Sequence, residues 1–139
     1  MKRRIVISAV AAAALTGGVA QAQINSATAA GYMARGVAMY HDKNYEGCLD
    51  QLLQVRNLDP EIAQQEEAQY YMAMATLYFG DDEALAMLED FRLRYPQSPR
   101  CSDVTAAIGD YYFTRGSYTE ALQAYLSVSP ESLTDDRRD

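Results

Sequence analysis

The stretch that decides the fold is FTRGSYTEALQAY, residues 113–125. Tyr118, Ala121 and Tyr125 are separated by steps of three and four, so a helix would place them on one face. Gly116 stands just before this helical pattern, where a preceding helix would end and the chain would reverse. The stretch therefore predicts the corner of a helical hairpin.

The same pattern occurs three times along the chain. Its central small residue is Cys48, then Ala84 after 36 residues, and then Ala121 after another 37. A small or flexible residue stands 12 positions before each of these: Gly36, Met72 and Gly109. A proline stands 12 positions after the first two: Pro60 and Pro96. Three helix-turn-helix units of this period predict a repeat array, in which each unit buries its apolar face against the next.

The three units resemble tetratricopeptide (TPR) repeats. The third copy, IGDYYFTRGSYTEALQAY, matches nearly every position of that pattern. The first copy matches at Gly36, Tyr45 and Pro60, and the second is the loosest, with Met72 and Asp81 at positions that usually hold a glycine and an aromatic residue. The resemblance covers roughly residues 26–130. It implies an all-α fold, a right-handed α-solenoid with repeats at about 29–62, 65–98 and 102–135.

Local signals predict where the helices begin and end. Capping residues followed by proline mark helix starts at Asp59, Ser98 and Ser129. Gly80, Gly116 and Asn44 are predicted to take the left-handed conformation that closes a helix. The expected helices are 26–41, 45–57, 60–79, 82–94, 99–114 and 117–128, with a seventh beginning near 130. No strand is expected, since no segment has the necessary alternation.

Residues 1–22 have the pattern of a secretory signal peptide. Three basic residues precede an apolar run and a glycine-rich break, and Ala20 and Ala22 supply the small residues at a cleavage site. An amphipathic helix or a membrane anchor is the alternative, but the apolar run is short for a membrane span. No cysteine follows the run, so we expect an exported protein, periplasmic or outer-membrane-associated, without a lipid anchor. Residues 23–139 then form the repeat domain.

Charge excludes one class of partner. Removal of residues 1–22 leaves nine basic and 19 acidic residues, a formal charge of −10. Nucleic acids and anionic membrane surfaces require a basic footprint, so neither is an expected partner. The two cysteines, Cys48 and Cys101, lie in different repeats that should hold them too far apart for a disulfide. We expect Cys48 in the core and Cys101 as a partly exposed thiol.

Catalytic and metal-binding patterns are missing from the sequence. His41 is the single histidine, and no cysteine or carboxylate stands at a metal-ligand spacing from it. The acidic run GDDE at 80–83 is shorter than a calcium loop and fits the first turn of a helix. No nucleophile elbow, phosphate loop or dinucleotide fingerprint occurs. We therefore expect a protein that is not an enzyme and that needs no metal or cofactor.

The resemblance implies a binding groove lined by the first helix of each pair. The corresponding residues are Met33, Val37 and Tyr40, with His41 beside them, then Gln69, Ala73 and Thr76, and then Ala106, Asp110 and Phe113. Repeats of this family that capture acidic chaperone tails use lysine, arginine and asparagine here, and none of those nine positions carries one. We therefore expect a protein or peptide partner with a basic or apolar segment. The repeat style is similar to that of periplasmic TPR proteins that assist outer-membrane assembly or envelope constriction.

The last ten residues, PESLTDDRRD, leave two readings open. They form either a polar lid over the end of the array or the beginning of a further repeat, and the single apolar residue Leu133 favours the second. The alternative function follows from this segment. The repeats would then be a structural or self-assembly module of a larger envelope protein, and isolated copies would associate through their last helices.

Overall fold

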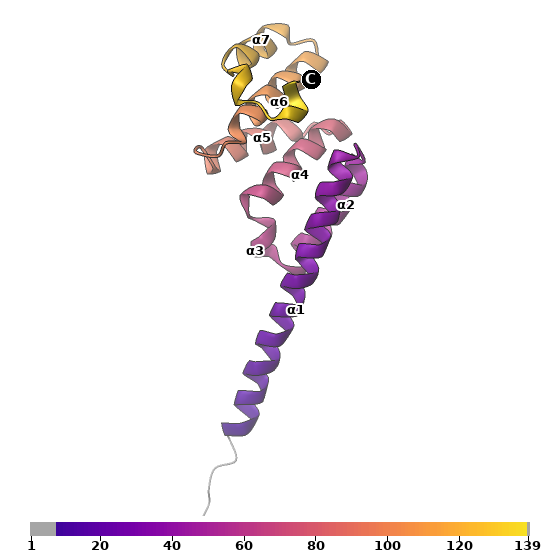
Figure 1. Ribbon diagram of the computed structural model, residues 1–139, viewed down its shortest axis with the longest axis vertical. Coiled ribbons are helices and arrows are strands. Elements are labelled where there is room, and N and C mark those ends of the chain that lie inside the picture. Colours follow the sequence, from indigo (N-terminus) through magenta and orange to yellow (C-terminus); the bar gives the residue numbers. More distant parts are fainter. Residues whose placement is uncertain (1–7, 139) are drawn as a thin grey trace, which may run out of the picture.

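The computed structural model describes residues 8–138, and this part of the chain is helical without any strand. The expected all-α fold is confirmed. The elements are α1 (Ser8–His41), α2 (Tyr45–Leu58), α3 (Pro60–Ala63), α4 (Glu66–Phe79), α5 (Ala84–Arg94), α6 (Cys101–Thr114), α7 (Tyr118–Leu126), the 3-10 turn η1 (Pro130–Ser132) and α8 (Asp135–Arg138) (Figure 1).

The long helices form three successive pairs, α1 with α2, α4 with α5, and α6 with α7. Each pair packs against the next, because α4 contacts α2 and α6 contacts both α4 and α5. The side chains between them form one core, in which Leu52, Met74, Leu88 and Phe91 are almost completely buried. The first part of α1 extends away from the body of the molecule, and the later pairs lie at the opposite end (Figure 1).

Two of the three predicted helix-closing residues are confirmed. Gly80 and Gly116 have φ angles of 96° and 78°, in the region that glycine adopts without strain. Asn44 is the exception, since its φ is −88° and the positive φ of 60° belongs to Lys43. Asn44 instead caps the start of α2, where its side chain accepts a hydrogen bond from the Gly47 amide. The competing preference of asparagine for the N-cap position explains this error.

The predicted helix 60–79 is wrong, because the chain breaks it into α3 and α4. Asp59 caps the first piece as expected, accepting hydrogen bonds from the amides of the two residues after Pro60. The break comes at Gln64 and Gln65, where Gln65 is extended with ψ of 153°. The hydroxyl of Tyr95, the residue after α5, donates to the Gln64 carbonyl at 2.5 Å, so this contact replaces a bond of the continuous helix.

At both ends of the described chain, the structure differs from what the local sequence patterns predicted. Gly17 and Gly18, predicted to form a break, lie within α1, which runs on through Ala20 and Ala22. The helix expected near 130 is only the turn η1 followed by the four residues of α8. Within residues 8–138, no helix combines the length and apolar character needed to cross a membrane.

Both cysteines are free. Cys48 is fully buried and Cys101 is half-buried, which confirms the expected core position and the expected partly exposed thiol. Burial raises the pKa of the Cys48 thiol to about 11. The Cys101 thiol donates a hydrogen bond to the Tyr95 carbonyl at 3.1 Å. The two side chains therefore have packing roles in different helix pairs.

Candidate functional site

Four tyrosines from three helices gather on one side of the first two helix pairs. This tyrosine cluster consists of Tyr40 of α1, Tyr45 of α2, and Tyr71 and Tyr78 of α4. The ring of Tyr40 lies 5.1 Å from that of Tyr71 and 6.4 Å from that of Tyr78, and Tyr45 and Tyr78 are 5.2 Å apart. Edge and tilted contacts of this kind stabilise each other by about 0.5–1.5 kcal/mol per pair beyond their burial. Tyr71 is buried and Tyr40 and Tyr45 are half-buried, so the cluster is an ordered aromatic group that reaches the surface at Tyr78.

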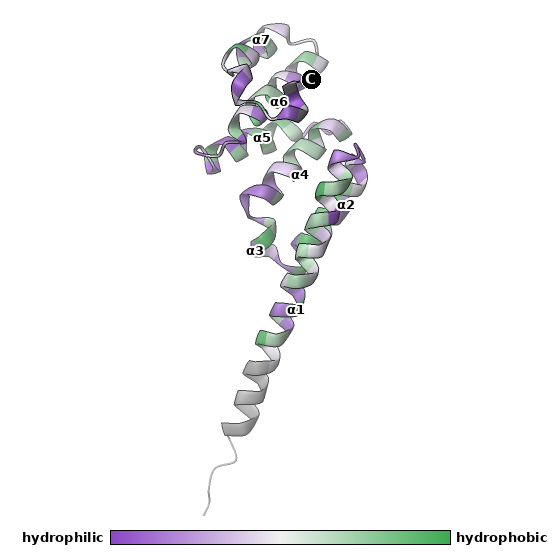
Figure 2. Ribbon diagram, in the orientation of Figure 1, coloured by the Kyte–Doolittle hydropathy of each residue, from purple (hydrophilic) through white to green (hydrophobic). Residues whose placement is uncertain are grey.

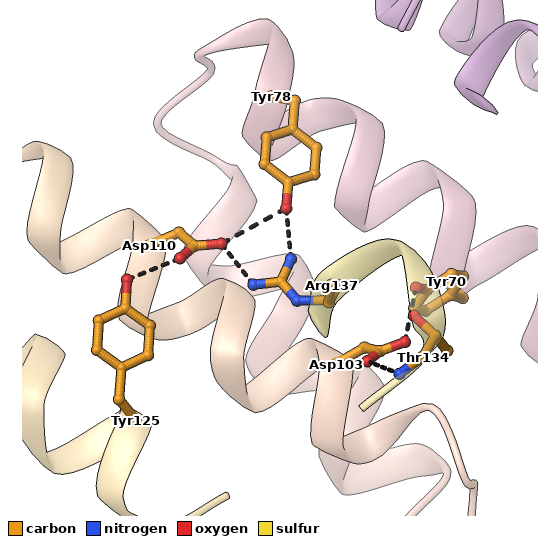
Figure 3. A network of polar contacts seen from close by, with 7 residues as sticks. All are labelled: Tyr70, Tyr78, Asp103, Asp110, Tyr125, Thr134 and Arg137. Carbon is orange, nitrogen blue, oxygen red and sulfur yellow. Dashed lines mark hydrogen bonds and ion pairs between the residues drawn. The ribbon is translucent and has the colours of Figure 1, made fainter. Parts of the chain in front are cut away.

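At the edge of this cluster, two side chains hold the guanidinium of Arg137 and a third holds the carboxylate that it binds. This arginine socket consists of Tyr78 of α4, Asp110 of α6 and Tyr125 of α7 (Figure 3). Arg137 Nη2 donates to Asp110 Oδ2 at 2.6 Å, and Nη1 donates to the Tyr78 hydroxyl. The Tyr125 hydroxyl donates to the other carboxylate oxygen of Asp110 at 2.7 Å. The side chain of Arg137 is only 13% exposed, so the ion pair is largely screened from solvent.

A second contact fixes the same C-terminal segment to α6. The carboxylate of Asp103 is fully buried, and one of its oxygens accepts a hydrogen bond from the Thr134 amide at 3.0 Å. Its other oxygen accepts a hydrogen bond from the Tyr70 hydroxyl of α4 at 3.3 Å. Figure 3 shows the two contacts along the same segment. Residues 134–137 therefore lie against α6 and α4, held by two acidic residues of α6 that are about two helical turns apart.

The electrostatics keep these groups in their hydrogen-bonding forms. Burial raises the pKa of Tyr40, Tyr70 and Tyr78 above the usual value for a phenol. Burial and the hydrogen bond to Asp110 do the same for Tyr125. Burial opposes the charge of Arg137, but its bonds to Asp110 and Tyr78 outweigh this and raise its pKa. Around neutral pH the hydroxyls thus stay protonated and the guanidinium charged.

The residues expected to line a groove lie in different environments. Met33, Ala73, Thr76 and Ala106 are buried, so these four contact the protein's own side chains. Thr76 lies on the side of α4 that faces α2 and α5, at a cavity of about 280 Å³. Val37, Tyr40, Gln69 and Asp110 are half-buried, whereas His41 and Phe113 are exposed.

Only part of the expected set comes together. Tyr40 and Asp110 are linked through Tyr78, whose ring contacts the first and whose hydroxyl lies 3.5 Å from the second. Gln69 instead donates to the Ala63 carbonyl at 2.6 Å, and Phe113 packs on the ring of Tyr118. His41 lies beside the cluster, 5.6 Å from Tyr40 between ring centres.

Sequence reasoning missed Tyr78, Asp103, Tyr125 and Arg137. Tyr125 was visible in the quoted stretch 113–125, but its helical spacing indicated a packing role alone. The only signal for Arg137 was its charge. It is a basic residue in the C-terminal segment of a chain that is acidic overall, so a contact with an acidic residue of the repeats was to be expected. Figure 2 shows α8 as one of the most hydrophilic parts of the fold.

Other surfaces of the described residues offer little chemistry. Among residues 8–138, no group of three or more histidine, cysteine, aspartate or glutamate side chains is placed to hold a metal ion. A cavity of about 610 Å³ lies along α5, α6 and the end of α7, and no residue of the arginine socket lines it. Its lining includes Arg92, Leu93, Cys101 and Thr105. Comparison with protein-family models and with curated proteins gives no match for this sequence.

Proposed function

We propose that this protein is a non-enzymatic interaction scaffold, which binds a peptide or a partner helix beside the tyrosine cluster and the arginine socket. One observation carries the proposal. A short segment of the chain itself, residues 134–137, lies across α6 and α4 and is held through a backbone amide and an arginine side chain. A surface that holds its own segment in this way has the chemistry to hold the segment of another protein.

The composition of the surface supports a basic or amphipathic ligand. Tyrosine offers a large rigid area and a hydroxyl, and it is a frequent residue at the centre of protein interfaces. The carboxylate of Asp110 lies next to the Tyr78 ring of this cluster and favours a cationic partner. Binding of this kind requires no metal or cofactor. The repeat spacing supports a right-handed, TPR-like α-solenoid as the framework, with the groove on the side of its first helices.

The proposed location is the cell envelope. The basic start, the apolar run and the small residues Ala20 and Ala22 support export with cleavage after Ala22, giving a periplasmic or outer-membrane-associated protein. Mass spectrometry of the protein recovered from cells tests this directly. A mass beginning at Gln23 is expected, and a mass that retains residues 1–22 would contradict the export proposal.

The binding proposal is tested by capture from an envelope extract followed by titration of the purified partner. Three chains are compared: wild type, Asp110→Lys in the socket, and Asp50→Lys on the exposed side of α2 as a control of equal charge change. We expect a partner that binds wild type and Asp50→Lys with the same Kd and binds Asp110→Lys at least about tenfold more weakly. Circular dichroism must show equal helicity. Equal binding of the partner by all three chains would show that this surface does not bind it.

A second function is favoured by the exposed face of α7. Tyr118, Leu122 and Leu126 are all exposed on this helix, and such residues are suited to contact with another helix. The alternative is therefore a structural module that joins copies or repeats end to end. Sedimentation of the wild type and of a Leu122→Glu, Leu126→Glu variant distinguishes the two. Association that is lost in this variant, with no effect of Asp110→Lys, would favour the structural role.

A further inference from the structure

The arginine socket is a small site with a defined shape. Asp110 receives hydrogen bonds from three groups, the hydroxyls of Tyr78 and Tyr125 and the guanidinium of Arg137. The Tyr78 hydroxyl in turn accepts a hydrogen bond from the other terminal nitrogen of Arg137. The three socket residues come from α4, α6 and α7, so the site forms only when the second and third helix pairs pack together.

We propose that the arginine socket recognises an arginine side chain of the partner segment, and that Arg137 occupies the site in cis until the partner displaces it. This rests on the proposed binding function and specifies its ligand class. The Tyr78 hydroxyl and the Asp110 carboxylate each accept a hydrogen bond from a different nitrogen of one planar guanidinium. A lysine side chain has a single nitrogen and cannot donate to both acceptors in this way. The geometry therefore favours arginine over lysine, although both carry the same charge.

The segment that carries Arg137 is held by polar contacts and buries little apolar surface. Its helix α8 has four residues, and Ser132 and Thr134 are exposed while Leu133 is half-buried. A cavity of about 390 Å³ lies beside it, lined by Pro130, Glu131, Leu133 and Arg137. With so little apolar burial, such a segment opens more readily than the packed helices.

The cis arginine is also incompletely satisfied. Arg137 Nε is buried and has no hydrogen-bond partner among the described residues, which is an unfavourable state for an N–H group. A partner arginine that enters the socket with its Nε paired to its own chain would avoid this penalty. This unsatisfied N–H reduces the advantage of the cis arginine over a partner arginine whose Nε is paired.

The buried carboxylate of Asp103 adds a second feature to the recognised segment. It accepts the Thr134 amide, three residues before Arg137, at the start of a helical turn. A side-chain oxygen that accepts such an amide acts like the cap of a helix. The expected ligand is a short helical turn with a free backbone amide followed, three residues later, by arginine.

The test is a titration of the full chain with a fluorescent peptide of residues 129–139, SPESLTDDRRD. The wild-type chain is compared with Arg137→Ala, which empties the socket, and with Arg92→Ala, which removes an exposed arginine of α5. If the cis segment fills the socket about 90% of the time, it weakens the apparent affinity about tenfold. We therefore expect the Arg137→Ala chain to bind the peptide about tenfold more tightly than the wild-type and Arg92→Ala chains.

Two further changes test arginine specificity in the Arg137→Ala chain. A peptide with lysine in place of its first arginine, and a chain that also carries Tyr78→Phe, should each bind at least about fivefold more weakly. Tyr78→Phe removes one hydroxyl and keeps the ring, so it serves as the test even if Asp110→Lys fails to fold. Equal binding of arginine and lysine peptides, or no peptide binding to the Arg137→Ala chain, would overturn the proposal.

The same experiments distinguish a failure of this inference from a failure of the proposed scaffold function. Suppose a partner does not bind the Asp110→Lys chain but binds the Tyr78→Phe, Arg137→Ala and wild-type chains equally. This result would support the scaffold function and refute the recognition of arginine by the socket. Wild-type chains that dimerise, with dimers lost in Arg137→Ala, would identify a second copy as the occupant and also refute the proposal. A supporting result requires tighter peptide binding after Arg137→Ala and monomeric wild type.

Discussion

The close approach of Tyr125 to Gly109 gives a sharp prediction about how α6 and α7 pack. A Cβ atom built on Gly109 would lie 2.5 Å from Cε1 and 2.7 Å from Cδ1 of the Tyr125 ring. These distances are far below van der Waals contact, so Gly109→Ala must push the ring away. The ring is also tethered, because its hydroxyl donates to Asp110 at 2.7 Å.

The magnitude follows from three opposing effects. Overpacking of this kind costs about 1–3 kcal/mol, and disturbing the hydrogen bond to Asp110 costs up to about 1 kcal/mol. Replacement of glycine by alanine inside a helix contributes about 1 kcal/mol in the favourable direction. The net expectation for Gly109→Ala is a loss of about 1–2 kcal/mol in the free energy of unfolding.

Gly36 is the matched control, because it occupies the corresponding place in the first helix pair. A Cβ atom there would meet the Gln51 Cβ at 3.3 Å and the Cys48 carbonyl at 3.5 Å, which small shifts can relieve. The favourable helix propensity then offsets the crowding, so Gly36→Ala should stay within about 1 kcal/mol of wild type. Urea denaturation followed by circular dichroism measures both variants.

A rescue experiment assigns the effect to the ring. In a Tyr125→Ala background the obstacle is gone, so adding Gly109→Ala should stabilise the chain by about 1 kcal/mol through helix propensity. The reasoning fails if Gly109→Ala is as well tolerated as Gly36→Ala. It also fails if the destabilisation persists unchanged when Tyr125 is alanine.

Three other predictions concern the thiols and one helix cap. The pKa of Cys48 rises from 9.0 to about 11 on folding, so its stabilising contribution is complete below pH 9 and is lost as the pH rises through 11. Denaturation at pH 8 and pH 11 should show a loss of roughly 2–3 kcal/mol from this group, and Cys48→Ala should reduce the loss. In the native protein at pH 8, a colorimetric thiol reagent should label the half-buried Cys101 and spare the buried Cys48 until urea is added, and rapid labelling of both would contradict the packing. Asp59→Ala should lower Tm more than Asp59→Asn, because asparagine can still accept the amide bonds at the start of α3, and equal Tm values would show that the cap is dispensable.

Local chemistry explains the parts of the fold that the sequence predicts correctly. The turns at Gly80 and Gly116 need a positive φ, and the cap at Asp59 needs a side-chain acceptor beside Pro60. Each of these requirements involves only a few neighbouring residues, so it can be recognised in the local sequence. The small residue Cys48 is likewise fully buried where the helix spacing places it.

Distant contacts explain the errors. The break between α3 and α4 depends on Tyr95, which lies 31 residues beyond the Gln64 carbonyl that it binds. The C-terminal segment contacts Tyr78, 59 residues earlier, through Arg137. No periodicity within either segment encodes these pairings. In the candidate site, Tyr40 and Asp110 stand at positions that the resemblance to TPR repeats implies, whereas Tyr78 and Arg137 required the three-dimensional arrangement of the helices.

Packing and the proposed recognition of arginine depend on the same position in this molecule. Gly109 lacks a side chain, so the Tyr125 ring can lie against α6, and its hydroxyl then reaches Asp110 in the next position of the same helix. The small residue that marks the repeat pattern therefore also orients the carboxylate of the arginine socket. A change at Gly109 should weaken peptide binding in proportion to its displacement of Tyr125, even though no ligand contact is lost directly. Stability and affinity measured on the same Gly109 and Tyr125 variants would show whether the two properties change together.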